Sequence, residues 1–211
     1  MTSVLIIDDH PIVLQGCRRV LEDAGMEPVL AASDLVAGYR LYRRHKPDVT
    51  IVDLAIQGKG LGGLELIRRI RRHDARAPIL VLSMHNDVMI VARSLEAGAS
   101  GYVLKDTSSE ELVKAVQQVS TGAPFLSGDL AVKMAMTGSR TRGNPLADLT
   151  PRELQVLALL ADGKPYDRIA NELSISYKTV VNVSSQLKQK LNASNLPELV
   201  SIAVKLLAPQ P

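Results

Sequence analysis

Five side chains that can bind a metal or take part in group transfer stand at the ends of four short apolar runs. Each run is three or four residues long and rich in Val, Ile and Leu, which is typical of buried parallel strands. The five groups are the carboxyl groups of Asp8, Asp9 and Asp53, the hydroxyl of Ser83 and the amino group of Lys105. Because open α/β sheets bind ligands at the carboxyl ends of their strands, these groups are expected to meet at one edge of a sheet.

The chemistry that this set favours is metal-assisted transfer of a phosphoryl group. Adjacent acids such as Asp8 and Asp9, with Asp53 near them, provide the oxygen ligands that Mg²⁺ prefers. A carboxylate beside such a cation can attack phosphorus and form an aspartyl phosphate, while a lysine offsets the charge on the phosphoryl oxygens. Any one of these residues alone is more often a loop acid, a helix cap or a solvated lysine. All five together, at the ends of four strands, predict a reaction site.

The elements that must position this site alternate strand with helix. A further short strand is expected at residues 29–32, and apolar side chains recur at helical spacing between the strands. The expected helices cover residues 11–24, 34–45, 64–73, 87–97 and 108–120. Strands that alternate with helices of this length form right-handed βαβ units. Residues 1–124 therefore predict a five-stranded, doubly wound parallel sheet of the flavodoxin-like kind.

Length and composition fit two small domains without a membrane anchor. The chain has 211 residues, of which 46% are hydrophobic and 22% charged. No apolar run approaches the roughly 18 residues of a membrane span, and the start has no signal-peptide pattern. The single cysteine, Cys17, cannot form an internal disulfide and is interpreted as a core residue. These features indicate a cytoplasmic protein.

From Leu149 onward the pattern changes to helices only. Thr150, Pro151 and Glu153 form a capping-box sequence that starts a helix. A short helix, a tight turn and a longer helix follow, which is the helix-turn-helix pattern whose second helix can enter the DNA major groove. These last elements are expected at residues 166–173, 174–176, 177–191 and, for a final helix, 196–207. The predicted organisation is a domain at 1–124, a linker at 125–147 and a small all-α domain at 148–211.

Charge is distributed unevenly between the two halves. Residues 1–124 contain 15 Lys+Arg and 15 Asp+Glu, whereas residues 125–211 contain 10 and 7. The excess of cations in the second half is consistent with a nucleic-acid partner, although it is small.

The first half resembles the receiver domain of bacterial response regulators. The resemblance rests on the strand ends and on three local stretches, Ile7-Asp8-Asp9-His10-Pro11, Ala97-Gly98-Ala99-Ser100-Gly101-Tyr102 and Leu104-Lys105-Asp106. It implies that Asp53 accepts a phosphoryl group from a histidine kinase. It also implies that Asp8, Asp9, Asp53 and the backbone carbonyl of Ala55 hold Mg²⁺. Ser83 and Tyr102 are then the switch pair, and Lys105 contacts the phosphoryl group.

One loop departs from the receiver pattern and allows two other interpretations. Residues 54–65 run two residues longer than is usual, lack the expected proline and have Gly62 where an acid normally stands. Gly58, Gly60 and Gly63 spell GxGxxG, a dinucleotide fingerprint, but the motif is not in the first βαβ unit and no ribose-binding acid follows. An aspartyl phosphatase commonly has a second Asp two residues after the first, where this chain has Ala55. Neither enzyme interpretation is favoured, and the chain is expected not to be an enzyme.

The second half resembles the LuxR/FixJ-type DNA-binding domain over its whole length. The matching stretches include Leu149-Thr150-Pro151-Arg152-Glu153, Ile169-Ala170, Ile175-Ser176 and Lys178-Thr179-Val180. The recognition helix departs from the family, because Val181 and Val183 replace the usual Lys and His. The residues predicted to contact double-stranded DNA are Lys178, Thr179, Val181, Asn182, Ser185, Gln186 and Lys188.

The sequence therefore predicts a two-component response regulator that is phosphorylated on Asp53 and controls transcription as a dimer. Pairing of two copies is expected through the last helix, whose apolar residues are Leu196, Leu199, Val200, Ala203 and Leu207. The alternative is a phosphorylation-gated module whose second domain docks a protein and does not read DNA, with Val181 and Val183 as core residues.

Overall fold

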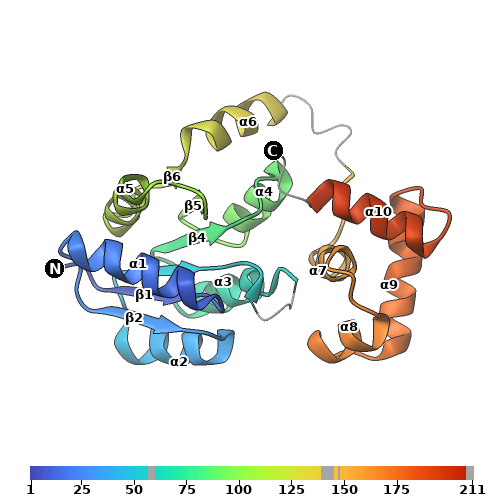
Figure 1. Ribbon diagram of the computed structural model, residues 1–211, viewed down its shortest axis with the longest axis horizontal. Helices are drawn as coiled ribbons and strands as arrows, with labels where there is room; N and C mark the ends of the chain where they lie inside the picture. The colour runs from blue at the N-terminus through green and yellow to red at the C-terminus, as the bar shows by residue number, and fades with distance from the viewer. Residues whose placement is uncertain (57–59, 139–144, 147, 208–211) are drawn as a thin grey trace.

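A parallel sheet of six strands carries the candidate site. The computed structural model describes residues 1–56, 60–138, 145, 146 and 148–207 (Figure 1). The strands are β1 (Val4–Ile7), β2 (Val29–Ala32), β3 (Val49–Val52), β4 (Ile79–Ser83), β5 (Gly101–Leu104) and β6 (Phe125–Leu126). Their order is β2-β1-β3-β4-β5-β6, and every neighbouring pair is parallel. The strand order reverses beside β1 and β3, which is where such sheets bind ligands.

Five helices cover the two faces of this sheet. They are α1 (Pro11–Asp23), α2 (Leu35–His45), α3 (Gly62–His73), α4 (Val88–Glu96) and α5 (Ser109–Ser120). Helices α1 and α5 pack on one face, and α2, α3 and α4 pack on the other (Figure 1). The side chains of Asp34, Asp87 and Ser108 accept hydrogen bonds from the first-turn N–H groups of α2, α4 and α5. The caps thus fix where these helices begin.

All five predicted strands and all five predicted helices are present, with one addition to the sheet. Phe125 and Leu126 form β6, which pairs with Gly101 and Tyr102 of β5. The sheet therefore has six strands and not five, because the chain stays alongside β5 for two residues after α5. Helix α3 also begins two residues earlier than predicted, at Gly62.

The last four helices form a second, all-α part of the chain. Helix α6 (Gly128–Gly138) lies before it and packs against α4; the four helices that follow are α7 (Pro151–Ala161), α8 (Tyr166–Glu172), α9 (Tyr177–Lys190) and α10 (Leu196–Leu207). Thr150 and Glu153 form the predicted capping box at the start of α7. Helices α8 and α9 pack on each other, and α7 packs against both α9 and α10. We call residues 4–126 the α/β part and residues 148–207 the helical part.

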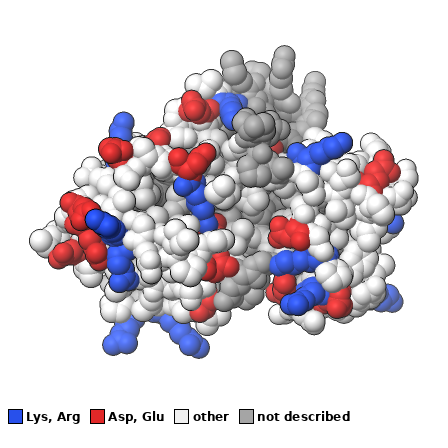
Figure 2. Space-filling view, in the orientation of Figure 1, with Lys and Arg blue, Asp and Glu red and all other residues white. Residues whose placement is uncertain are grey.

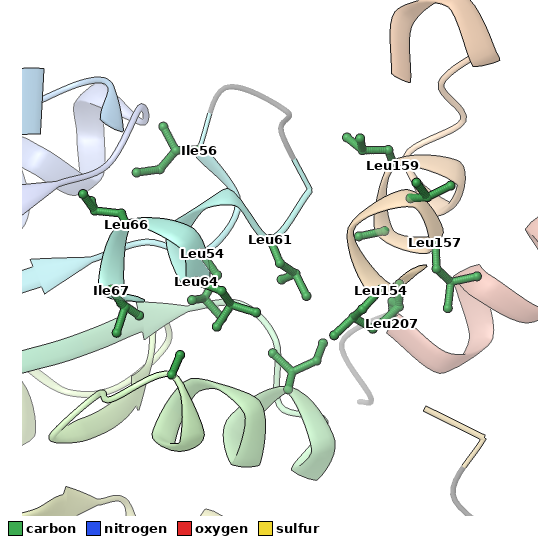
Figure 3. Packing of buried hydrophobic residues seen from close by; sticks show 14 of the residues in the cluster. Leu54, Ile56, Leu61, Leu64, Leu66, Ile67, Leu154, Leu157, Leu159 and Leu207 are labelled. Carbon is green, nitrogen blue, oxygen red and sulfur yellow. The ribbon is translucent and has the colours of Figure 1, made fainter. Parts of the chain in front are cut away.

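The two parts share one apolar contact. Figure 3 shows Leu61 and Leu64 of the α/β part on the side that faces Leu154 and Leu207 of the helical part. All four side chains are buried. Arg93 of α4 adds a polar contact, since its Nη2 donates to the backbone carbonyl of Leu149 at 2.6 Å. Helices α7 and α10 thus lie against the α/β part, and α9 lies on the far side of them (Figure 1).

Close packing requires a glycine at one position of the GxGxxG pattern, Gly63. A Cβ at this position would collide with the backbone carbonyl of Asp53 and lie 2.7 Å from the Cα of Leu54. The start of α3 can therefore pass this closely beside the strand that ends in Asp53 only if residue 63 lacks a side chain. The described glycines of the motif serve packing in this structure.

We predict that Gly63→Ala lowers the free energy of unfolding by about 1–3 kcal/mol, because the backbone of Asp53 and Leu54 must shift. Gly16→Ala is the matched control, since a Cβ on Gly16 in α1 meets nothing within 4 Å. That change should instead stabilise the protein by up to about 1 kcal/mol. Urea unfolding followed by circular dichroism measures both, and equal unfolding midpoints for the two variants would contradict the packing role.

Candidate functional site

Three predicted residues meet at the carboxyl end of the sheet. The Nζ of Lys105, directly after β5, lies 2.8 Å from Oδ2 of Asp8 and 2.8 Å from Oδ2 of Asp53. The side chains of both acids are 2% exposed and that of Lys105 is 8% exposed. Buried charges are costly unless they are paired. The lysine therefore holds the ends of β1 and β3 together through the residues that follow them.

The oxygen-rich set fits a hard divalent cation. Asp8, Asp9, His10 and Asp53 each offer one ligand atom, and these atoms all lie within 4.8 Å of one another. Three carboxylates face one lysine, so a cation would offset the excess of negative charge. The Ala55 N–H donates to Oδ1 of Asp53 at 3.3 Å, and Ala55 lines the same cavity. These residues agree in position with the predicted metal ligands.

His10 is a site residue that the sequence interpretation did not single out. Its Nδ1 lies 2.8 Å from Oδ1 of Asp8 and 3.1 Å from Oδ1 of Asp9. Its backbone N–H also donates to Oδ1 of Asp8 at 2.8 Å. A histidine directly after two adjacent acids was a visible signal, although only the turn after β1 brings its ring back onto their carboxylates.

Burial governs the electrostatics of the acid that the sequence singles out. Burial raises the pKa of Asp53, although the hydrogen bond and charge of Lys105 act in the opposite direction. For Lys105, burial lowers the pKa, but the bonds to Asp53 and Asp8 outweigh it and the pKa is raised. The raised pKa of Asp53 favours its neutral form, whereas the raised pKa of Lys105 reflects a partner carboxylate that is ionised. The geometry favours the ion pair, because both Nζ–oxygen distances are those of charge-assisted hydrogen bonds.

Ser83 and Tyr102 are joined to each other through the loop after β4. The Tyr102 hydroxyl donates to the backbone carbonyl of His85 at 2.7 Å, and the His85 N–H donates to Oγ of Ser83 at 3.3 Å. Burial raises the pKa of Tyr102, whose side chain is completely enclosed. Hydrogen bonds to the backbone of one residue, His85, therefore connect Ser83 and Tyr102.

The site opens into a cavity of about 470 Å³ that both parts of the chain line. From the α/β part come the candidate phosphoacceptor Asp53 and its neighbours. From the helical part come Ala158, Ala161 and Asp162 at the end of α7, and Val204 and Leu207 of α10. This second wall was not predicted, because sequence spacing carries no information on how two domains pack.

The second candidate site is the outer face of α9. Of its predicted DNA contacts, five are exposed and two, Thr179 and Lys188, are half-buried. The exposed residues Lys178, Val181, Asn182, Ser185 and Gln186 recur at intervals of three and four along α9, so they share one face. Val181 is 39% exposed, whereas Val183 is 8% exposed. The alternative that both valines are core residues therefore holds for Val183 only.

The side chain of Lys190 in α9 is paired within the helical part, because its Nζ lies 2.8 Å from Oε2 of Glu153 and donates to the Asp148 carbonyl. One expectation about this part is corrected. In α10, three residues of the predicted pairing surface point inward and are buried, namely Leu199, Ala203 and Leu207. Leu196 and Val204 are the large apolar residues of α10 that stay exposed.

Charges of both signs are mixed on the face that Figure 2 shows. Figure 2 shows Lys and Arg interspersed with Asp and Glu over the face in view, in both parts of the chain. A strong single-sign field, the usual electrostatic footprint of nucleic-acid binding, is not seen on that face. Within the described residues, no helix is long and apolar enough to cross a membrane.

Comparison with known proteins assigns a family to each half of the chain. Residues 4–117 match the response regulator receiver domain family, and residues 147–203 match the luxR family of bacterial regulatory proteins. The methanol utilization control regulatory protein MoxX of Paracoccus denitrificans is 38% identical over 198 residues, which is 94% of this chain and 89% of MoxX. The chain therefore belongs to the response regulators that join a receiver domain to a LuxR-type helix-turn-helix domain.

Solved structures of the family cover nearly the whole chain. The RcsB response regulator of Salmonella typhimurium has a TM-score of 0.78 at 30% identity, with 98% of each chain covered. RcsB of Salmonella enterica serovar Typhimurium, bound to promoter rprA in the presence of the phosphomimetic BeF3⁻, has a TM-score of 0.71 at 31% identity, covering 97% of this chain and 99% of RcsB. Both agree with the combination of a parallel α/β sheet and a helical DNA-binding part. The protein is a transcriptional response regulator that binds DNA.

The ion pair between buried Glu153 and exposed Lys190 generates a test of how α9 is held. Burial raises the pKa of Glu153, but hydrogen bonds from Lys190 and Thr150 more than offset it and hold the pKa below its ordinary value. A lowered folded-state pKa stabilises the fold above the ordinary range of Glu, and this stabilisation is lost as pH falls through the folded-state pKa.

We therefore predict that Glu153→Gln costs about 1–2 kcal/mol of unfolding free energy at pH 7. The gap to the wild type should shrink as the pH falls below the ordinary range of Glu. Urea unfolding at several pH values measures it, with Glu22→Gln on the exposed face of α1 as the matched control. A gap that stays constant down to acid pH would contradict the ion-pair explanation.

Proposed function

We propose that Asp53 is the residue that accepts the phosphoryl group, from a histidine kinase and with Mg²⁺. The observation that carries this proposal is the convergence of Asp8, Asp53 and Lys105, with both lysine–oxygen distances at 2.8 Å, at the carboxyl end of the sheet. A buried carboxylate whose pKa is raised is a better nucleophile when ionised than a solvated one. Lys105 keeps Asp53 ionised and in place.

In the transfer, a carboxylate oxygen of Asp53 forms a bond to phosphorus while the bond from phosphorus to the donor's leaving atom breaks. Lys105 can then turn from Asp53 towards the phosphoryl oxygens, since its Nζ already lies beside the attacking group. Asp8, Asp9, Asp53 and the backbone carbonyl of Ala55 would hold Mg²⁺, which offsets negative charge on those oxygens. Ser83 and Tyr102 form the switch pair, joined through His85. The phosphoryl group stays on the protein's own Asp53 side chain and is not passed on to another substrate.

For the output, we propose that the exposed face of α9 reads DNA through Lys178, Val181, Asn182, Ser185 and Gln186, with Thr179 and Lys188 at its edge. The support is that these residues share one solvent-facing side of the helix. RcsB, a structural relative, has been solved on promoter DNA. Only Lys178 and Lys188 remain available as cations on α9, so phosphate contacts from one copy are few. Two copies on two half-sites supply the missing affinity, and phosphorylation favours the dimer.

The domain boundaries proposed for this function are a receiver at 1–124, a linker at 125–147 and a DNA-binding domain at 148–211. Phe125 and Leu126 extend the receiver sheet by β6, so the linker in effect begins after them. The proposed location is the cytoplasm, where the protein can meet both a histidine kinase and DNA.

The first test of this function is labelling. Acetyl phosphate with Mg²⁺ should label the wild type on Asp53 and should not label Asp53→Asn, as read by mass spectrometry of peptides. Asp23→Asn, which changes an exposed acid of α1, is the matched control and should label normally. Stable labelling of Asp53→Asn at another acid would refute the assignment.

The second test concerns the DNA face. Lys188→Ala should weaken binding to selected DNA and lower the slope of log Kd against log salt by about one, because one phosphate contact is lost. Lys205→Ala removes the same charge from an exposed position on α10 and should leave the slope unchanged. Val181→Ala should relax the preference at one base pair, since a thymine methyl loses its apolar partner. Mobility shifts at several salt concentrations decide, and equal slopes for the two lysine variants would refute the proposed contact.

A further inference from the structure

The cations of the α/β part gather at one end of α2 and α3. Residues 1–124 contain 15 Lys and Arg, and nine of these fall in two short stretches, 40–46 and 68–76. The two stretches contain one acid, Asp74. They lie side by side, because α2 packs on α3 and the Tyr42 hydroxyl donates to Oδ2 of Asp74 at 3.0 Å. The nine residues are Arg40, Arg43, Arg44, Lys46, Arg68, Arg69, Arg71, Arg72 and Arg76.

Two of these nine cations are used within the fold. Arg71 donates to three oxygen acceptors around the end of α3. Arg68 is half-buried and its Nη1 lies 3.8 Å from Oε2 of Glu65. Among the described residues, an acid lies within 4.0 Å of only one other member, Arg72. We call the seven exposed members the arginine patch, which consists of Arg40, Arg43, Arg44, Lys46, Arg69, Arg72 and Arg76.

Stabilisation of the helix ends accounts for only part of this patch. Cations in a last turn interact favourably with the C-terminal end of a helix, and three members lie in the last turns of α2 and α3. Arg40 and Arg69 lie before those turns, and Arg76 lies beyond the end of α3. Like charges this close together repel one another, so an anion that binds them relieves the repulsion.

The chemistry of the patch fits a row of phosphates better than a protein surface. Protein interfaces have an apolar centre, and in α2 and α3, both fully described, Val36 is the large hydrophobic residue that is exposed. A guanidinium presents parallel N–H groups that match two phosphate oxygens. Tyr39 and Tyr42 are buried, so they are not available to stack on a base. The contact is therefore made to a phosphate backbone and does not read sequence.

The arginine patch and the recognition helix lie at opposite ends of the chain's fold. In a parallel βαβ unit each helix returns to the amino edge of the sheet, so the ends of α2 and α3 lie at that edge. The helical part lines the cavity at the carboxyl edge, and α9 lies beyond α7 and α10 (Figure 1). A duplex held on α9 does not reach the patch in this arrangement, which leaves the patch accessible to a different segment of DNA.

We propose that the arginine patch binds the phosphate backbone of a second DNA segment, without sequence preference, while α9 holds the first. Duplex DNA is the polyanion that a DNA-binding protein already meets. Once α9 is bound, other segments of the same DNA lie at a high effective concentration. The second contact depends on release of counterions, so it weakens steeply as salt rises. Bridging of two segments rests on the proposed DNA face of α9, whereas the phosphate contact of the patch does not.

Two pairs of neighbouring arginines give a matched test in the full-length protein. Arg43→Gln/Arg44→Gln removes two cations from the patch, and Arg18→Gln/Arg19→Gln removes two exposed cations from α1. Glutamine is a good helix former, so both helices should be retained, which circular dichroism checks. Arg43→Lys/Arg44→Lys keeps the charge of the patch and separates a loss of charge from a change in folding.

The assay measures capture of a second duplex. A duplex with one selected half-site is immobilised, protein is bound to it, and a fluorescent duplex of unrelated sequence is added at several salt concentrations. The glutamine pair in α2 should hold the fluorescent duplex about ten-fold more weakly than the wild type. The slope of its log Kd against log salt should be lower by about two, because two phosphate contacts are lost.

The control variants should behave differently. The glutamine pair in α1 and the lysine pair in α2 should both keep the wild-type slope for the fluorescent duplex. All four proteins should bind the half-site duplex alone with equal affinity, because that contact is made by α9.

Four results would overturn the proposal. One is unchanged capture by the glutamine pair in α2, and another is an equal loss in the two glutamine pairs, which would reflect net charge alone. A lysine pair that behaves like the glutamine pair in α2 would indicate a role in folding. Patch-dependent binding of phosphatidylglycerol vesicles without capture of the second duplex would assign the patch to a lipid surface.

Failure of the proposed DNA face of α9 gives a different result. The wild type would then not be retained on the half-site duplex. Direct titration with the fluorescent duplex still measures the patch, and the glutamine pair in α2 should again lower the salt slope by about two.

Discussion

The ammonium group of Lys105, held between the carboxylates of Asp8 and Asp53, is the interaction on which the α/β part depends. Each of these groups is almost completely enclosed, and a buried charge without a partner is strongly destabilising. The ends of β1, β3 and β5 must therefore meet at one point of the sheet. Because Asp8 and Asp53 share one lysine and Asp9 lies beside them, the carboxylates outnumber the lysine, and a divalent cation would offset the excess of negative charge.

The elements that position this site could be predicted because their signals are local. Asp34, Asp87 and Ser108 cap helices within three residues of themselves, and Thr150 with Glu153 does so at α7. Buried parallel strands read as apolar runs, so their polar ends were visible. β6 was not predicted because a strand of two residues is too short to show periodicity. It is recognisable only by its pairing with β5.

What the sequence could not provide is which side of a helix meets which neighbour. Apolar spacing in α10 predicted a pairing surface, yet Leu199, Ala203 and Leu207 pack inward against the rest of the chain. Val181 and Val183 are two residues apart in α9 and of the same type, but one faces solvent and the other the core. Nothing in the sequence pattern pairs Lys190 with Glu153, 37 residues earlier, yet the two side chains form an ion pair at 2.8 Å. Each outcome depends on a contact made across the fold.

The contact between the two parts also places carboxyl groups of both around Asp53. A phosphoryl group on Asp53 would replace one carboxylate charge with about two negative charges, in a cavity whose walls include Asp9 on one part and Asp162 on the other. Burial already raises the pKa of Asp162, so this wall tolerates added negative charge poorly. A group that disfavours one arrangement shifts the equilibrium by its differential free energy in the two states. A phosphoryl group on Asp53 would therefore weaken the contact that α7 and α10 make with the α/β part.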